Sequence, residues 1–177
     1  MTASKRALTL EDIAEVARLS AESAEAEAVY RLVERISAQT IGWRLFTILR
    51  YVEAEGAVER IYSSDPKTYP VGGRKLLSQF TSNHGAMQRG EIFLAPTRAD
   101  VRQAYADHES LFALGVTAIL NVPIRHAGRR LGTMNLCGEE GVYGATEVAR
   151  GRVLAGLLAP WLLQGTPLPP DTSLKPL

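Results

Sequence analysis

The sequence predicts an α+β fold. An antiparallel sheet carries N- and C-terminal helices on one face, and a helical and loop insert covers a pocket on the other. The clearest observation is a β-hairpin, in which two apolar runs, Thr117–Ile124 and Leu131–Cys137, flank the polar, glycine-containing tip Arg125–Arg130. Helical apolar spacing occupies both ends of the chain, and a stretch rich in Pro and Gly precedes the hairpin. Helices that flank a run of strands are typical of α+β domains.

Residues 1–40 form the predicted N-terminal helical segment. Thr9 and Asp12 have the spacing of a capping box at a helix start. Between Ser20 and Ala28 alanine is the only apolar residue type, so we expect the helix to break or to change partner there. Two apolar stripes flank this stretch, Ile13, Val16 and Ala17 before it and Val29, Leu32, Val33 and Ile36 after it.

Two strands are expected next, because branched and aromatic residues dominate Trp43–Val52 and Val58–Ser63 and suit a sheet. Glu53–Gly56 is the turn between them. A loop, Ser64–Lys75, follows with the sequence SDPKTYPVGGRK. Its segment Gly72–Lys75 either binds an anion through backbone N–H groups and two cations or is an ordinary loop, since no Walker spacing is present.

The insert begins with Leu76–Gly90, which is unevenly amphipathic, with Leu76, Leu77, Phe80 and Met87 as its apolar positions. Glu91–Ala95 reads as a short strand. Thr97 with Asp100 forms a second capping box, which opens a helix that we expect to continue to Gly115.

The last helix has the spacing of a buried stripe, and a proline-rich tail, residues 165–177, follows it and is expected to be extended or disordered. The stripe consists of Leu154, Leu157, Leu158, Trp161 and Leu162.

The hairpin also predicts which side chains share a face. If the tip is centred on Gly128, Asn121 lies opposite Asn135, and facing side chains of an antiparallel pair point to the same side. One face then carries these two amides among uncharged residues, which indicates a covered pocket. The other face is a plain core face with Ala118, Leu120, Val122, Ile124, Met134 and Leu136.

Composition excludes several classes of function. The 177 residues include 20 basic and 19 acidic ones, and a net charge of +1 gives no general attraction to nucleic acid. No apolar run approaches the roughly 18 residues of a membrane span. The N-terminus turns acidic where a signal peptide has its apolar core, so we expect a cytoplasmic protein without a membrane partner. The single cysteine excludes an internal disulfide.

The candidate ligand contacts are polar groups and aromatic rings. The side chains of Asn121 and Asn135 each offer donors and acceptors to a ligand. His108, beside Asp107, is either an anchor or base or a histidine that only holds its helix in the core. Arg60 and Arg74 either pair with a ligand anion or are ordinary exposed arginines. The aromatic candidates, which either line the cavity or fill the core, are Trp43, Phe46, Tyr62, Tyr69 and Phe112.

An enzymatic function is the less favoured class, although it stays open. No serine-centred nucleophile motif and no matched acid–base pair is evident. His84, His108, His126 and Cys137 share no metal-ligand spacing, so no metal is expected. A small organic ligand of unknown identity is the expected cofactor-like partner.

The run from Ile41 to about Leu163 resembles a GAF domain, a fold related to PAS, and is similar to small bacterial proteins that consist of little else. The resemblance rests on the order and spacing of Arg60–Ser63, Tyr69–Arg74, Asp107–His108, Leu114–Gly115, Asn121–Ile124 and Leu131–Leu136. It implies that residues 41–164 form the GAF-like domain, with a pocket between the sheet and the insert. GAF domains bind small molecules such as cyclic nucleotides, tetrapyrroles, amino acids or aromatic compounds, or they only dimerise.

Two functions follow as expectations. The preferred one is a sensory or regulatory protein of signal transduction that binds a small molecule and acts through a partner or through its own homodimer, formed by the N- and C-terminal helices. The alternative is a structural or dimerisation module whose pocket is vestigial.

Overall fold

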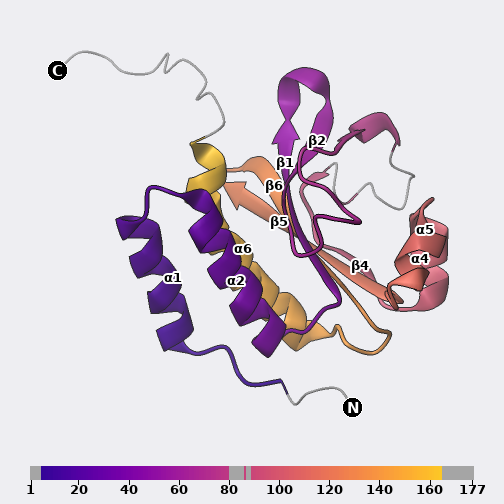
Figure 1. Cartoon of the computed structure of the whole chain (residues 1–177), viewed down its shortest axis with the longest axis horizontal. Helices are drawn as coiled ribbons and strands as arrows, with labels where there is room; N and C mark the ends of the chain where they lie inside the picture. The colour runs from indigo at the N-terminus through magenta and orange to yellow at the C-terminus, as the bar shows by residue number, and fades with distance from the viewer. Residues whose placement is uncertain (1–4, 80–85, 87–88, 165–177) are drawn as a thin grey trace.

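The structure, a computed structural model, describes residues 5–79, 86 and 89–164 (Figure 1). Its helices and strands follow the predicted order with two differences. A short strand, β3, forms at the end of the expected loop Ser64–Lys75, and one expected helix of the insert is two helices. In chain order they are α1 (Leu10–Glu22), α2 (Ala26–Thr40), β1 (Leu45–Val52), η1 (Glu53–Glu55), β2 (Ala57–Ser63), β3 (Arg74–Leu76), η2 (Leu77–Gln79), β4 (Phe93–Ala95), α4 (Arg98–Ala104), α5 (His108–Ala113), β5 (Ala118–His126), β6 (Arg129–Gly138) and α6 (Ala145–Leu163).

The strands form one six-stranded sheet in the order β3-β2-β1-β6-β5-β4, and every neighbouring pair is antiparallel. Helices α1, α2 and α6 pack together on one face of this sheet, and the short helices α4 and α5 lie near its β4 edge (Figure 1). The predicted α+β architecture, with both terminal helical segments on one face, is therefore confirmed. No helix in the described part of the chain is both long and apolar enough to span a bilayer.

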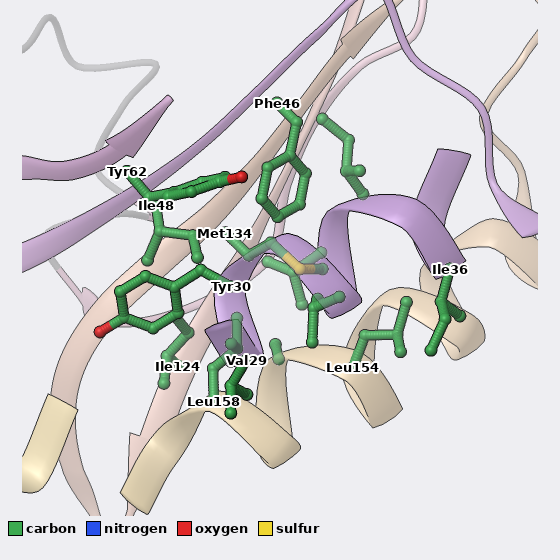
Figure 2. Close-up of a cluster of buried hydrophobic side chains, with 14 of the residues drawn as sticks. Val29, Tyr30, Ile36, Phe46, Ile48, Tyr62, Ile124, Met134, Leu154 and Leu158 are labelled. Atoms are coloured by element: carbon green, nitrogen blue, oxygen red, sulfur yellow. The ribbon is translucent and has the colours of Figure 1, made fainter. Parts of the chain in front are cut away.

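The main core lies between the sheet and these three helices. Phe46 and Ile48 of β1 and Met134 of β6 point from the sheet toward α2 and α6, where they meet Val29 and Leu154 (Figure 2). All five side chains are fully buried. Burial of each such side chain stabilises the fold by about 1.5–3 kcal/mol, so this layer holds the helices on the sheet.

The N-terminal helical segment breaks where the sequence predicts, because α1 ends at Glu22 and α2 begins at Ala26. The capping box of α1 is present. The Asp12 N–H donates to Thr9 Oγ1 at 3.3 Å, and the Thr9 N–H donates to Asp12 Oδ2 at 2.9 Å. Arg6 donates to both carboxylate oxygens of Asp12, at 2.5 and 2.7 Å, and to Gln39 Oε1 of α2 at 2.8 Å. The start of α1 is thereby tied to the end of α2.

The central hairpin has the predicted register, with Asn121 paired to Asn135. A register shift after Ile124 brings the strands to a two-residue turn, Ala127–Gly128. Both turn residues have positive φ, 47° and 76°, as a tight type I′-like hairpin turn requires.

The insert differs from its prediction in one respect. The helix expected from Thr97 to Gly115 is two helices, α4 and α5, separated at Tyr105–Asp107. The second capping box, formed by Thr97 and Asp100, is confirmed. The amphipathic stretch Leu76–Gly90, with Phe80 and Met87, lies in large part outside the described residues.

Candidate ligand-binding site

A cavity of about 390 Å³ lies on the sheet face opposite α1, α2 and α6. Strands β1, β2, β5 and β6 form its floor, and the segments around Tyr69–Lys75 and Tyr105–Leu111 form its walls. Its apolar lining consists of Leu45, Leu49, Val58, Leu111 and Ile119, and its polar lining of Thr47, Arg60, Tyr69, Arg74, Lys75, Tyr105, Asp107, Asn121, Asn135 and Cys137. Apolar walls with a few polar groups are typical of small-molecule pockets.

Both predicted amides lie in this floor. Asn135 is 7% exposed, donates from Nδ2 to Thr47 Oγ1 at 3.0 Å and accepts at Oδ1 from Thr133 Oγ1 at 3.0 Å. Asn121 is 3% exposed and donates from Nδ2 to the Tyr105 hydroxyl at 2.9 Å. Asn135 therefore links two strands of the floor, and Asn121 joins the floor to the wall segment between α4 and α5.

Arg60 is the cation that β2 contributes to the cavity, and the loop Tyr69–Gly73 wraps around it. Its Nη1 donates to the Pro70 carbonyl at 3.0 Å, and its Cζ lies 5.2 Å from the centroid of the Tyr69 ring. The Arg60 N–H donates to Gly73 O at 2.9 Å, and the Gly72 N–H donates to Arg60 O at 2.8 Å. The Gly-rich segment was one candidate for an anion-binding loop. In the structure the Gly72 N–H and the Gly73 carbonyl instead extend the pairing of β2 and hold Arg60 in place.

The buried thiol and phenol groups of the cavity have raised pKa values, which keep them protonated near neutral pH. Burial raises the pKa of the Cys137 thiol to about 12 and that of the Tyr69 phenol to about 12. Burial likewise raises the pKa of Tyr105 and lowers that of Arg60. A thiol with so high a pKa is a poor nucleophile, so these groups suit binding better than covalent or acid–base chemistry.

Three of the aromatic candidates lie on the other face of the sheet and do not line this cavity. Phe46 is fully buried against the helices (Figure 2), and Trp43 Nε1 donates to Ser37 Oγ at 3.0 Å. The Tyr62 hydroxyl bonds Glu34 of α2, and its ring meets the Tyr30 ring edge-on. The expectation that these rings wall the cavity is therefore wrong.

A β-bulge explains the position of Tyr62. The β1–β2 register pairs Ile48 with Tyr62 but Leu49 with Arg60, so Ile61 is the extra residue. Tyr62 and Arg60 are two apart in sequence and would share a face of a regular strand, but the bulge directs them to opposite faces.

His108 and Phe112 lie on α5 outside the cavity lining. His108 Nδ1 lies 2.8 Å from the Tyr105 carbonyl oxygen, and its ring lies 5.5 Å from that of Phe112. The guanidinium carbon of Arg98 lies 3.7 Å from the Phe112 centroid. Of the ten candidate ligand contacts, the structure thus brings Arg60, Tyr69, Arg74, Asn121 and Asn135 together at the cavity. Tyr105, Asp107 and Cys137 were not selected from the sequence, and only the break between α4 and α5 directs Tyr105 toward β5.

The sheet order, the helix layer and the opposed cavity define the chain as a protein with the GAF fold. It is similar to the GAF domain of a phosphoenolpyruvate-protein phosphotransferase from Coxiella burnetii, with a TM-score of 0.72 and 17% identity over 88% of this chain and 93% of that chain. It is also similar to the GAF domain of the phosphoenolpyruvate-protein phosphotransferase from Acinetobacter, with a TM-score of 0.71 and 13% identity over 88% of this chain and 93% of that chain. A phycocyanobilin-bound GAF domain from a cyanobacterial phytochrome matches with a TM-score of 0.67 and 15% identity, over 90% of this chain and 96% of that chain. No protein-family model matches the chain, and no curated protein matches its sequence.

Proposed function

We propose that this protein is a sensory or regulatory GAF-domain protein that binds a small organic molecule in the cavity described above. The observation that carries the proposal is the convergence of Arg60, Tyr69, Asn121 and Asn135 on one largely apolar cavity of about 390 Å³. That volume lies within the roughly 300–1,000 Å³ of known ligand pockets. The phytochrome GAF domain of the same fold holds phycocyanobilin, which supports a ligand-binding role for this architecture.

The proposal includes an output through the terminal helices. Strands β5 and β6 contact the cavity with one face and α6 with the other, since Val122, next to Asn121, approaches Gly151 of α6. Exposed apolar side chains on these helices, Leu10 at 75% and Val153 at 40%, offer a contact for a second copy. We therefore place a homodimer contact on α1 and α6, and we place the protein in the cytoplasm.

The second candidate function is a structural or dimerisation module with an unused cavity. It is favoured by the amide donors of Asn121 and Asn135, which already bond Tyr105 and Thr47 within the protein. Such a module predicts that no compound raises the melting temperature, whereas the melting temperature rises with protein concentration.

The test is a thermal-shift screen of small metabolites, together with native mass spectrometry of freshly purified protein. Leu49→Trp fills the cavity from its partly exposed floor, and His126→Trp adds the same ring at the exposed hairpin tip, outside the cavity lining and outside the proposed dimer contact. We expect the ligand-induced shift to disappear in Leu49→Trp and to persist in His126→Trp, with both variants folded by circular dichroism. A bound compound that both variants retain equally contradicts this site, and a screen without any bound compound favours the dimerisation module.

A further inference from the structure

One corner of the cavity contains buried polar atoms that lack partners. Arg60 Nε and the Tyr69 hydroxyl are buried, and neither has a hydrogen-bond partner among the described residues. An unsatisfied buried polar group costs about 1–3 kcal/mol. This corner therefore lacks a hydrogen-bond acceptor, although the loop Tyr69–Gly73 packs closely around Arg60.

The missing acceptor has a definite geometry. Nη1 of Arg60 is occupied by the Pro70 carbonyl, which leaves the Nε–Nη2 edge of the guanidinium. That edge presents two parallel N–H donors, which match the two oxygens of a carboxylate. In the described part of the chain Arg60 has no ion-pair partner, whereas Arg50 pairs with Glu59 at 2.7 Å and Arg74 with Glu55 at 2.7 Å.

The charges around this corner favour one negative charge over two. Arg74 is neutralised by Glu55 and Glu59. Burial lowers the pKa of Arg60, the charge of Asp107 opposes that shift, and the same carboxylate would repel a dianion more strongly than a monoanion. The remaining walls nearby, Val58, Leu111 and Ile119, are apolar.

We propose that the ligand is a small monocarboxylic acid whose carboxylate binds Arg60 and Tyr69 and whose apolar body lies against Val58, Leu111 and Ile119. This inference rests on the proposed function and specifies the class of ligand. Because Arg60 Nε and the Tyr69 hydroxyl are buried, this binding requires the Tyr69 side chain to shift as the carboxylate enters, after which the Tyr69 hydroxyl donates to the carboxylate. Gly73 supports the arrangement, since a Cβ there would lie 3.1 Å from Arg60 Nη1 and 3.4 Å from Pro70 O.

The experiment uses a panel of matched probes, each offered as the carboxylic acid and as its neutral amide: 3-methylbutanoate, benzoate, phenylacetate and 4-hydroxybenzoate. Inorganic phosphate and the amines of the same carbon skeletons complete the panel. We expect acids to bind and their amides to bind at least 10-fold more weakly by thermal shift and calorimetry. Arg60→Gln should weaken acid binding about 10- to 100-fold, as the loss of a charge-assisted hydrogen-bond pair predicts.

Three further variants keep the inference falsifiable. Arg60→Lys retains the charge without the two-donor edge and should bind acids with intermediate affinity. Gly73→Ala retains Arg60 but displaces its guanidinium, and it should also weaken acid binding. Arg129→Gln removes a cation at the hairpin tip and should leave binding unchanged. Amides that bind as well as acids, a preference for phosphate or amines, or an unchanged affinity in folded Arg60→Gln would overturn the carboxylate inference while the pocket function stands. A panel in which no compound binds also overturns the carboxylate inference, and the metabolite screen with native mass spectrometry then decides separately whether the proposed function stands.

Discussion

Two glycines in α6 test how closely this helix is seated on the sheet. At Gly156 an added Cβ meets nothing within 4 Å, so Gly156→Ala should stabilise the protein by about 0.5–1 kcal/mol through helix propensity alone. At Gly151 the added Cβ would lie 2.9 Å from Val122 Cγ2 and 3.9 Å from Met134 Cε. Overpacking of this kind costs about 1–3 kcal/mol. Gly151→Ala should therefore range from neutral to about 2 kcal/mol destabilising.

The comparison isolates the packing cost, because both substitutions gain the same helix propensity. The difference in the free energy of unfolding between the two variants should be about 1–3 kcal/mol, measured by urea denaturation with circular dichroism. Measurement at two protein concentrations separates this effect from any change in dimerisation. If Gly151→Ala stabilises the protein as much as Gly156→Ala does, α6 does not rest on β5 as described, and the reasoning is refuted.

Two further predictions concern ionisation. The hydrogen bond from Arg6 lowers the pKa of Asp12 from 3.8 to about 2, so this carboxylate stabilises the fold above pH 4 and its contribution is lost as the pH falls through 2. Asp12→Asn should lower the free energy of unfolding by about 1–2 kcal/mol at pH 7, which is less than the full pKa shift implies because Arg6 is partly exposed. At pH 2 the substitution should lower the free energy of unfolding by much less. Equal losses at the two pH values would contradict this role of the Asp12 carboxylate. Burial raises the pKa of Cys137 to about 12, so iodoacetamide at pH 8 should alkylate the folded protein on the order of 1000-fold more slowly than the protein in urea, and similar rates would show an accessible thiolate.

Local patterns allowed the hairpin and its face assignment to be predicted from the sequence. The two strands are adjacent in the chain, and the period-2 alternation of side chains fixes which residues face each other once the turn is located. A turn centred on Gly128 gives the pairing of Asn121 with Asn135, which the structure has. The turn itself lies at Ala127–Gly128, and the register shift after Ile124, which the position of the turn alone does not predict, restores this pairing. The capping boxes at Thr9 and Thr97 were equally predictable, because each depends on residues three positions apart.

The composition of the cavity wall could not be predicted in the same way, because it depends on an irregularity in strand pairing. Regular alternation puts Arg60 and Tyr62 on one face, and nothing local marks Ile61 as a bulged residue. The bulge arises from the pairing of β2 with β1, which is visible only in the sheet. Both Arg60 and Tyr62 were candidates for the cavity, and only Arg60 lines it. Similarly, the break between α4 and α5, which brings Tyr105 to Asn121, contains no Gly or Pro from which it could be predicted.

The same bulge gives the cavity a direct connection to the helix layer. Arg60 lies at the cavity, and Tyr62, two residues further along β2, contacts α2 through the Tyr30 ring and the Glu34 carboxylate. If the proposed ligand binds at the Arg60 corner, we expect its pull on Arg60 to reach β2 at the bulge, where the ladder of hydrogen bonds is interrupted. A ligand that binds at Asn121 is expected to act instead on Tyr105 and the helices of the insert. We therefore predict that an acid at the Arg60 corner changes the environment of α2, whereas a compound at Asn121 changes that of α4 and α5.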